Sequence, residues 1–314
     1  MHNDQFLWTE KYRPQTIDDC IIPMTTKKIF TPFIEKKELP NFIFSGTAGI
    51  GKTTVAKALC NEIGADCLFI NGSNEGRLID TLRMEIVPFA STVSLTDSPK
   101  VIIIDEADYM NASTVQPALR SLIEMYSKNC RFIFTCNYKS RIIDPIISRC
   151  QVVEFAVQPA HKAMMAAKMY KRVVSILNAE GITYDKSVLP ELITRYFPDF
   201  RKTLIELQSY SATGTIDSGI LLKSSHGSYS EMLEYLKNKE WLKLREWVAE
   251  NSDIDTFNLF RWLYDNSINI MEPLSVALLV SILAEYDYKS AFVADKEINL
   301  VCALTEIMKT CKFT

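Results

Sequence analysis

Short apolar runs alternate with amphipathic stretches along the first half of the chain. The runs are rich in Val, Ile, Phe and Cys and lie at 41–45, 67–71, 101–105, 131–136 and 151–155. Residues 101–104, Val-Ile-Ile-Ile, have no polar alternation, as expected for a strand that is covered on both faces. Residues 52–63 and 113–126 have helical spacing. Strands that alternate with helices predict right-handed βαβ units and a parallel sheet, so we expect an α/β domain.

The strand pattern ends near residue 155, and the remaining chain has helical spacing. Helices are predicted at 162–178 and 200–210, and again at 231–250, 256–266, 274–286 and 291–308. A looser segment between the two groups, Lys-Ser-Ser-His-Gly-Ser at 223–228, predicts a linker. We therefore expect three domains, which are an α/β domain over 1–156, a small helical domain over 157–226 and an all-helical domain over 227–314.

Composition and charge exclude several classes of protein. The formal net charge of the 314 residues is −3, so nucleic-acid binding would need a local basic surface. The first residues lack the pattern of a secretory signal, and the apolar stretch at 276–284 is too short to span a bilayer, so we expect a buried helix there. The eight cysteines form no CxxC pair, and the three histidines complete no zinc-ligand spacing. These features favour reduced thiols in a cytoplasmic protein without a membrane partner.

The clearest chemical signal is a glycine-rich segment between the first apolar run and the first predicted helix. The motif G-x-x-x-x-G-K-[ST] is matched by Gly46, Thr47, Ala48, Gly49, Ile50, Gly51, Lys52 and Thr53, and we include Thr54 in the same site. Backbone N–H groups of such a loop and the positive end of the helix attract phosphates. Lys52 would reach the β- and γ-phosphates, and the Thr53 hydroxyl would bind Mg²⁺. A glycine-rich turn without a ligand is the alternative, and the complete match in this context argues against it.

Two acidic residues follow the apolar run at 101–104. Ligands gather at the carboxyl ends of parallel strands, which is where Asp105 and Glu106 are expected. Asp105 would hold the Mg²⁺ shell, and Glu106 would activate the attacking water as a general base. Two acids that cap the start of a helix are the alternative. The phosphate loop upstream favours the catalytic pair, and the sequence thus predicts a site that binds and hydrolyses a nucleoside triphosphate.

With these motifs the chain resembles the AAA+ ATPases, and within them the subunits of DNA-polymerase sliding-clamp loaders. Residues 8–14, Trp-Thr-Glu-Lys-Tyr-Arg-Pro, look like the amino-terminal box that recognises the adenine end of ATP in this family, which implies that Trp8, Tyr12 and Arg13 contact the nucleotide. In the residues of its motifs the chain is most similar to the large subunits of bacteriophage loaders, and replication factor C small subunits are the nearest relatives. The resemblance implies an AAA+ P-loop domain, a helical lid and a helical collar for the three expected domains.

The resemblance also implies roles for three polar residues. Asn137 is similar to the first sensor, which places the attacking water, although an asparagine in a turn after a strand is the alternative. Arg149, in Ser-Arg-Cys, looks like the arginine finger that stabilises charge on the γ-phosphate of a neighbouring subunit; the alternative is a surface ion pair. Arg201 resembles the second sensor, which contacts the γ-phosphate from the lid, and a solvated helix-start arginine is the alternative. Together with Lys52 and Glu106 they form the expected catalytic set.

The resemblance also implies contacts with DNA in or near the helix that follows the second strand. Arg77 and Arg83 would bind phosphates there without reading sequence, although both are equally compatible with solvated helix positions. By resemblance, Gln116 and Arg120 on the next helix would relay DNA contact to the catalytic acid. The end of that helix, Ile-Glu-Met-Tyr at 123–126, would dock into a clamp pocket, and core packing is an equally good explanation of its apolar residues.

The resemblance implies an ATP-driven switch that opens a ring-shaped sliding clamp and places it on primer–template DNA during replication. The expected partners are the clamp, the DNA, a distinct small loader subunit and further copies of this chain in a five-membered ring. If the phage resemblance holds, the protein acts in the cytoplasm of an infected bacterial host. Two other functions stay open, namely another DNA-acting AAA+ motor or helicase loader, and an ATP-binding scaffold without turnover. The acid Glu106 argues against the scaffold.

Overall fold

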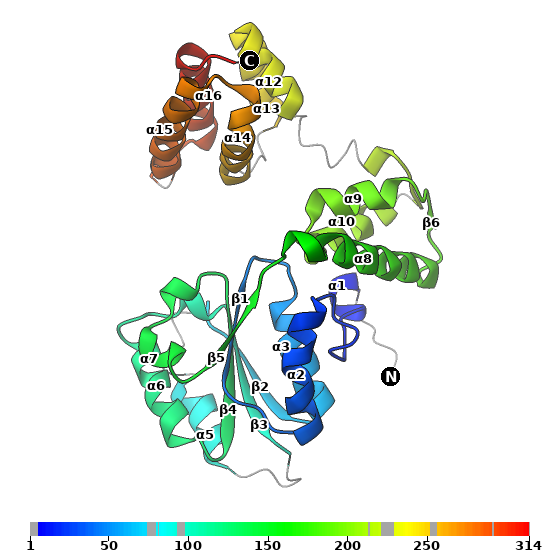
Figure 1. Ribbon diagram of the computed structural model, residues 1–314, viewed down its shortest axis with the longest axis vertical. Helices are drawn as coiled ribbons and strands as arrows, with labels where there is room; N and C mark the ends of the chain where they lie inside the picture. Colours follow the sequence, from blue (N-terminus) through cyan, green and yellow to red (C-terminus); the bar gives the residue numbers. More distant parts are fainter. Residues whose placement is uncertain are drawn as a thin grey trace. The chain divides into compact units, whose positions relative to one another are not determined.

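The structure is a computed structural model in which the chain forms two compact units, residues 1–220 and 221–314. It describes residues 6–73, 80, 82–92, 98–212, 214–220, 229–251, 256–290 and 292–313, and side chains 83, 230 and 258 are not described. The first unit holds an α/β domain followed by helices, and the second is helical (Figure 1). Each unit is described by itself.

A parallel sheet of five strands forms the centre of the first unit. The strands are β1 (Phe42–Gly46), β2 (Asp66–Asn71), β3 (Lys100–Asp105), β4 (Cys130–Cys136) and β5 (Gln151–Phe155). Their order is β2-β3-β4-β1-β5, and every pairing is parallel. The predicted α/β fold is confirmed, and each strand lies within one residue of its predicted bounds. All five carboxyl ends therefore lie at the same edge of the sheet.

Helices cover both faces of the sheet, which is why its strands lack polar alternation. One face packs against α2 (Met24–Lys36) and α3 (Lys52–Ile63), and the other against the π-helix Leu82–Ile86, α5 (Val87–Ser91), α6 (Val115–Met125) and α7 (Asp144–Ile147). Neighbouring residues of β1 show the alternation, since Phe42 and Phe44 belong to the first core and Ile43 to the second. None of these three side chains is exposed.

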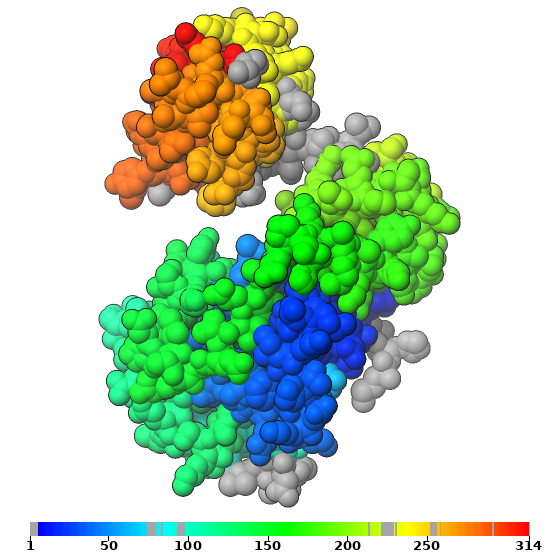
Figure 2. Space-filling view, viewed as in Figure 1, coloured from blue at the N-terminus to red at the C-terminus, as the bar shows by residue number. Residues whose placement is uncertain are grey.

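Helices follow β5 in the part of the first unit that the structure describes, and we call three of them the lid. They are α8 (Pro159–Ala179), α9 (Val188–Tyr196) and α10 (Phe200–Ser211). Two short strands, β6 (Thr183–Tyr184) and β7 (Thr215–Ile216), pair in parallel beside them. The prediction that strands end near residue 155 is therefore wrong, because a two-residue strand has no detectable hydrophobic period. The lid contacts the N-terminal helix α1 (Trp8–Lys11), and Figure 2 shows the green lid against the blue N-terminal residues.

The second unit is built from helices around one apolar core. They are α12 (Tyr229–Asn238), α13 (Trp241–Glu250), α14 (Thr256–Ile270), α15 (Pro273–Ser290) and α16 (Lys296–Thr310). The single helix predicted at 231–250 is wrong, because the chain turns between α12 and α13 with Lys239 in the left-handed region at φ 57°. A lysine gives no sequence signal for such a turn, which is usually made by Gly or Asn.

Helix α15 is only partly buried within its own unit. Leu279 is fully covered, whereas Leu274 is 84% exposed and Leu278 is 49% exposed. The expectation of a buried helix at 276–284 therefore holds for one face only. Among the helices that the structure describes, none is both long and apolar enough to cross a membrane. The expected domain boundary after residue 226 falls among residues that are not described and, like the boundary after 156, stays a prediction.

The packing of Phe44 generates a test of the fold. Its ring contacts those of Phe30, Phe42 and Phe155 at centroid distances of 5.3–5.6 Å. The change Phe44→Ala should lower the free energy of unfolding by about 3–5 kcal/mol, because it leaves a cavity between helix and sheet. Equilibrium unfolding in urea measures the loss. The control is Phe69→Ala on β2, where 42% of the residue is exposed and the cost should be much smaller. Equal losses for both would contradict the core assignment.

Candidate active site

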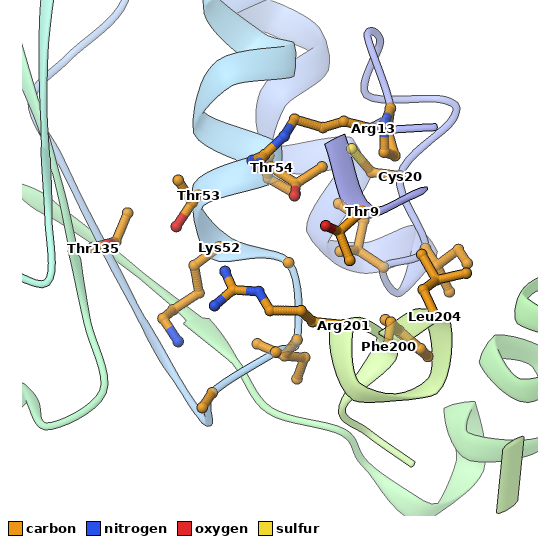
Figure 3. A pocket seen from close by; sticks show the side chains of 18 of the residues that line it. Thr9, Arg13, Cys20, Lys52, Thr53, Thr54, Thr135, Phe200, Arg201 and Leu204 are labelled. Atoms are coloured by element: carbon orange, nitrogen blue, oxygen red, sulfur yellow. The ribbon is translucent and has the colours of Figure 1, made fainter. Parts of the chain in front are cut away.

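A pocket lies at the carboxyl edge of the sheet, between the strand ends and the lid (Figure 3). It encloses about 1170 Å³ of empty space, open solvent included. Four parts of the chain line it, namely the N-terminal segment, residues 48–55, the ends of β3 and β4, and the lid. The lid contributes Met169, Arg172, Phe200, Arg201 and Leu204. The strand ends and the predicted phosphate loop thus converge on one space.

The loop between β1 and α3 needs glycine at two positions. Gly49 and Gly51 lie in the left-handed region, at φ 71° and 101°. A Cβ on Gly49 would also lie 1.9 Å from Oδ1 of Asp199, the residue before the lid helix α10. The first two residues of the motif, Gly46 and Thr47, do not line the pocket, and their carbonyl oxygens accept hydrogen bonds from the Lys52 ammonium. The loop and the lid therefore touch directly at Gly49.

The ammonium of Lys52 is held at the centre of the strand ends. Its Nζ donates to the carbonyl oxygens of Gly46 and Thr47, each at 2.8 Å, and to Oδ1 of Asn137 at 2.9 Å. Burial lowers the pKa of Lys52, and the Arg201 guanidinium adds to that effect. In Figure 3 Arg201 extends from α10 toward this lysine. Two cations and an amide thus meet where a phosphate chain would lie.

Asp105 gathers hydroxyl groups from both neighbouring elements. Its Oδ1 accepts hydrogen bonds from Oγ1 of Thr53 on α3 and of Thr135 on β4, each at 2.5 Å. A threonine hydroxyl beside a carboxylate is an oxygen set that suits Mg²⁺, and P-loop enzymes hold the ion with this pair of residue types. The residues present therefore fit the predicted metal role of Thr53 and Asp105.

Glu106 follows directly in an unusual backbone conformation. Its φ is 54°, in the left-handed region, and its N–H donates to Oγ1 of Thr135 at 3.1 Å. Asp108, two residues on, is 4% exposed, and its Oδ2 accepts the N–H groups of Asn137 and Tyr138, each at 3.1 Å. Asp108 therefore holds the segment that carries Asn137 beside Lys52. The sequence by itself indicates no role for Thr135 or Asp108, because their hydrogen bonds join one strand end to another.

The lid helix α10 starts at the phosphate loop. Asp199 caps this helix, since its Oδ1 accepts the N–H of Lys202 at 2.9 Å, and the N–H of Phe200 donates to the carbonyl of Gly49 at 3.3 Å. Arg201 is the second residue of the helix and lines the pocket. Asp199 is a third residue that sequence reasoning missed, although an Asp before a predicted helix is a usual cap signal.

The amino-terminal box reaches the pocket with two of its three expected residues. Tyr12 and Arg13 line it, whereas Trp8 is 5% exposed and its backbone N–H donates to Oε1 of Gln208 in the lid. The Tyr12 hydroxyl donates to Oε1 of Glu180 at 2.5 Å, and Lys11 forms an ion pair with the same oxygen at 2.7 Å. The Lys11 ammonium and then the Tyr12 hydroxyl hold the pKa of Glu180 below its usual value. The box is thus tied to the lid by hydrogen bonds and an ion pair.

Arg149 lies outside the pocket of its own chain, after α7. Its Nε donates to Oε1 of Glu124 on α6 at 2.7 Å, and a second guanidinium nitrogen contacts the same oxygen. Its Nη1 donates to the carbonyl of Pro145 at 2.6 Å. Within one chain Arg149 therefore makes a surface ion pair, which is the alternative to the arginine finger. Arg120 on α6 also forms an ion pair with Glu124, at 3.8 Å.

Gln116 is fully buried in α6 and joins this helix to the chain after β4. Its Nε2 donates to the carbonyls of Met110 and Arg141 at 3.0 and 2.9 Å, and its Oε1 accepts the N–H of Ile143 at 2.8 Å. It thus connects the segment after Asp105 to the segment that leads to Arg149. A linking role between sites agrees with this geometry, and the relay itself stays a prediction.

The predicted DNA and clamp contacts are less fully described. Arg77 lies outside the described residues, as does the side chain of Arg83, so their DNA contacts stay predictions. At the end of α6, Ile123 is 3% exposed and belongs to the core, whereas Met125 is 68% exposed. Ile123 and Met125 therefore differ in exposure, and of these two residues only Met125 is available to a partner.

Comparison with known proteins agrees with this geometry. Residues 42–157 match the model of the ATPase family associated with various cellular activities, and residues 161–222 match that of the sliding-clamp-loader large subunit, AAA+ ATPase lid domain. The sliding-clamp-loader large subunit of Enterobacteria phage T4 is 38% identical over 96% of this chain and 95% of that protein. The chain belongs to the sliding-clamp-loader family of AAA+ ATPases. The predicted family, fold class and ATPase activity are thereby confirmed.

Other relatives of this clamp-loader chain extend beyond phages. The large subunit from Escherichia phage RB69 is 35% identical over all of the chain and 98% of that protein. The replication factor C small subunit of Sulfurisphaera tokodaii is 33% identical over 97% of the chain and 95% of that protein. Among solved structures, the RuvB Holliday junction branch migration motor of Thermotoga maritima covers 71% of the chain and 78% of its own length with a TM-score of 0.55. At 16% identity that likeness concerns the fold alone.

The contact between Gly49 and Asp199 generates a prediction for nucleotide binding. The change Gly49→Ala should lower kcat/KM for ATP by about 10- to 100-fold, because the new methyl group displaces the lid from the phosphate loop. The matched control is Gly64→Ala, since Gly64 has nearly the same φ, 69°, and no atom within 4 Å of its Cβ position. That variant should lose about 1–2 kcal/mol of stability and keep its kinetics. Steady-state ATPase with thermal unfolding separates the two effects, and equal kcat/KM values would contradict the prediction.

Proposed function

We propose that this chain is the ATP-hydrolysing subunit of a clamp loader, which opens a ring-shaped sliding clamp and places it on primer–template DNA. The observation that carries the proposal is the meeting of Lys52, Asp105 and Arg201 in one pocket of a clamp-loader family member. Three elements far apart in the sequence supply these residues, and one of them is a lid. A lid over a phosphate site is suited to coupling nucleotide state to shape.

The chain's own residues support hydrolysis by positioning and charge. Lys52 would exchange its carbonyl partners for phosphate oxygens, and Arg201 would neutralise the γ-phosphate from the lid. Bound Mg²⁺ would screen phosphate charge while Thr53 and Asp105 hold it. Glu106 would take the proton of the attacking water, and Asn137, kept in place by Asp108, would orient that water.

Arg149 would act on the nucleotide of a neighbouring copy. Its position outside its own pocket and its place on the surface of the first unit support this role. To reach another site it must leave Glu124, and the energetic cost is small because exposed ion pairs contribute about 0–1 kcal/mol. Hydrolysis would then depend on assembly, with copies of this chain and a distinct small subunit as the partners.

Exposed apolar residues of the second unit support a role in assembly. Ile268 at the end of α14 and Leu274 at the start of α15 are 81% and 84% exposed, and Leu278 adds to them. Grouped exposed apolar side chains usually mark a binding surface. We assign this unit the function of a collar that joins subunits.

Steady-state ATPase of the chain co-expressed with its small partner subunit tests the proposed function. Strong stimulation that needs both a sliding clamp and primer–template DNA is expected. Stimulation by DNA alone would favour another DNA-acting AAA+ motor. Activity indifferent to both would contradict clamp loading, and no turnover at all would favour an ATP-binding scaffold.

The proposed action of Arg149 in a neighbouring site gives a separate prediction. In the assembled loader, Arg149→Ala should lower kcat by about 10³-fold, while ATP binding to the chain is unchanged. The control is Arg195→Ala, because that arginine also forms an ion pair, with Glu191 at 3.7 Å, and its side chain is 32% exposed, against 33% for Arg149.

Mixed assemblies distinguish action of Arg149 in its own site from action in the site of a neighbouring subunit. Copies with Arg149→Ala and copies with Lys52→Ala should recover part of the activity when co-assembled, since an intact site then meets an intact arginine. The absence of any recovery would show that Arg149 does not act in a neighbouring site.

A further inference from the structure

Thr135 occupies a buried position between the two acidic residues of the site. It lies on β4, two residues before Asn137, and is 2% exposed. Its Oγ1 is 2.5 Å from Oδ1 of Asp105 and 3.1 Å from the backbone nitrogen of Glu106. One hydroxyl group therefore contacts the carboxylate expected to hold Mg²⁺ and the backbone of the expected general base.

The direction of both hydrogen bonds follows from chemistry. A backbone N–H only donates, so the Thr135 oxygen accepts from Glu106, and its single proton is free for Asp105. Oδ1 of Asp105 also accepts a second hydrogen bond, which the Thr53 hydroxyl donates. The carboxylate is thus oriented by two donors, one on α3 and one on β4.

The backbone at Glu106 needs such support. A left-handed φ of 54° costs a residue with a side chain about 1–2 kcal/mol. The N–H of Gly72 donates to the carbonyl of Asp105 at 2.6 Å, and a Cβ on Gly72 would lie 2.9 Å from that oxygen and from the carbonyl oxygen of Glu106. The turn after β3 is therefore held by two hydrogen bonds, one from Gly72 directly after β2 and one to Thr135 on β4.

We propose that Thr135 is a positioning residue for ATP hydrolysis, which sets the direction of the Glu106 carboxylate and the orientation of Asp105. The inference rests on the roles proposed above for these two acids. A general base acts only within hydrogen-bond reach of the proton it removes, and a displacement of about 1 Å can cost 10²-fold in rate. Threonine suits this position because its branched side chain has a restricted χ1 angle, so the hydroxyl direction is fixed.

Removal of the hydroxyl alone should therefore affect turnover more than binding. Thr135→Val keeps the shape but leaves the N–H of Glu106 without its acceptor and Asp105 with one donor. In the assembled loader with clamp and DNA, kcat should fall by about 10- to 100-fold. The affinity for a fluorescent ATP analogue should change by less than about 3-fold, and half-saturation should need more Mg²⁺. Thr135→Ser, which retains the hydroxyl, should restore kcat to within about 3-fold of the unchanged protein.

A control hydroxyl exists in the second unit. Thr305 also donates and accepts, to the carbonyl of Val301 at 2.7 Å and from Nε1 of Trp241 at 3.0 Å. Thr305→Val should thus remove a hydroxyl that makes the same two kinds of hydrogen bond, and it should leave kcat unchanged. Thermal unfolding of every variant separates effects on turnover from effects on stability. Thr135→Ala serves as a second variant without the hydroxyl if Thr135→Val does not fold.

The outcomes separate this inference from the proposed site. If Thr135→Val keeps full kcat while Glu106→Gln abolishes turnover, the positioning role is wrong and the site stands. If Glu106→Gln itself keeps full kcat, the roles of the acids are wrong and the inference fails with them. If Thr135→Val and Thr135→Ser lower kcat, ATP affinity and the unfolding temperature together, Thr135 is only structural, which also overturns the inference.

Discussion

The parallel direction of β1, β3 and β4 is the constraint on which the site depends. Because the three strands run the same way, their carboxyl ends meet, so that Lys52 after the phosphate loop donates to Asn137 and Thr53 donates to Asp105. No local structure could bring together residues this far apart along the chain. The apolar strands that bury both faces of the sheet therefore also set the geometry of its polar edge.

The polar edge is itself organised by a buried charge. Lys52 is 8% exposed, and the free energy of burying its ammonium is offset by three acceptors, two from the loop and one from Asn137. Hydroxyl groups orient Asp105 in the same way on the neighbouring strand. The site thus has its donors and acceptors in place around the phosphate position, which is what phosphoryl transfer needs, since positioning and electrostatics supply most of its catalysis.

Two features of the chain are not among the residues that line the pocket. Arg149 sits on the surface in an ion pair with Glu124, and the second unit exposes large apolar residues such as Leu274. Helix α6 relates the first of these to the pocket, because Gln116 at one end contacts the segments after β3 and β4 and Glu124 at the other holds Arg149. A subunit with a complete phosphate site and an outward arginine is suited to hydrolysis that depends on neighbours.

The sequence by itself determined the strands, the phosphate loop and the acids Asp105 and Glu106, because each is a local pattern of spacing or of residue types with a definite chemistry. Family likeness added Asn137, Arg149 and Arg201. The tertiary structure alone decided that Thr135 and Asp108 hold these groups, that Asp199 lies against Gly49 of the phosphate loop, and that Trp8 is buried against the lid. Such roles depend on contacts between segments that are distant in the chain, and no spacing or composition records which buried hydroxyl or carboxylate will face which backbone group.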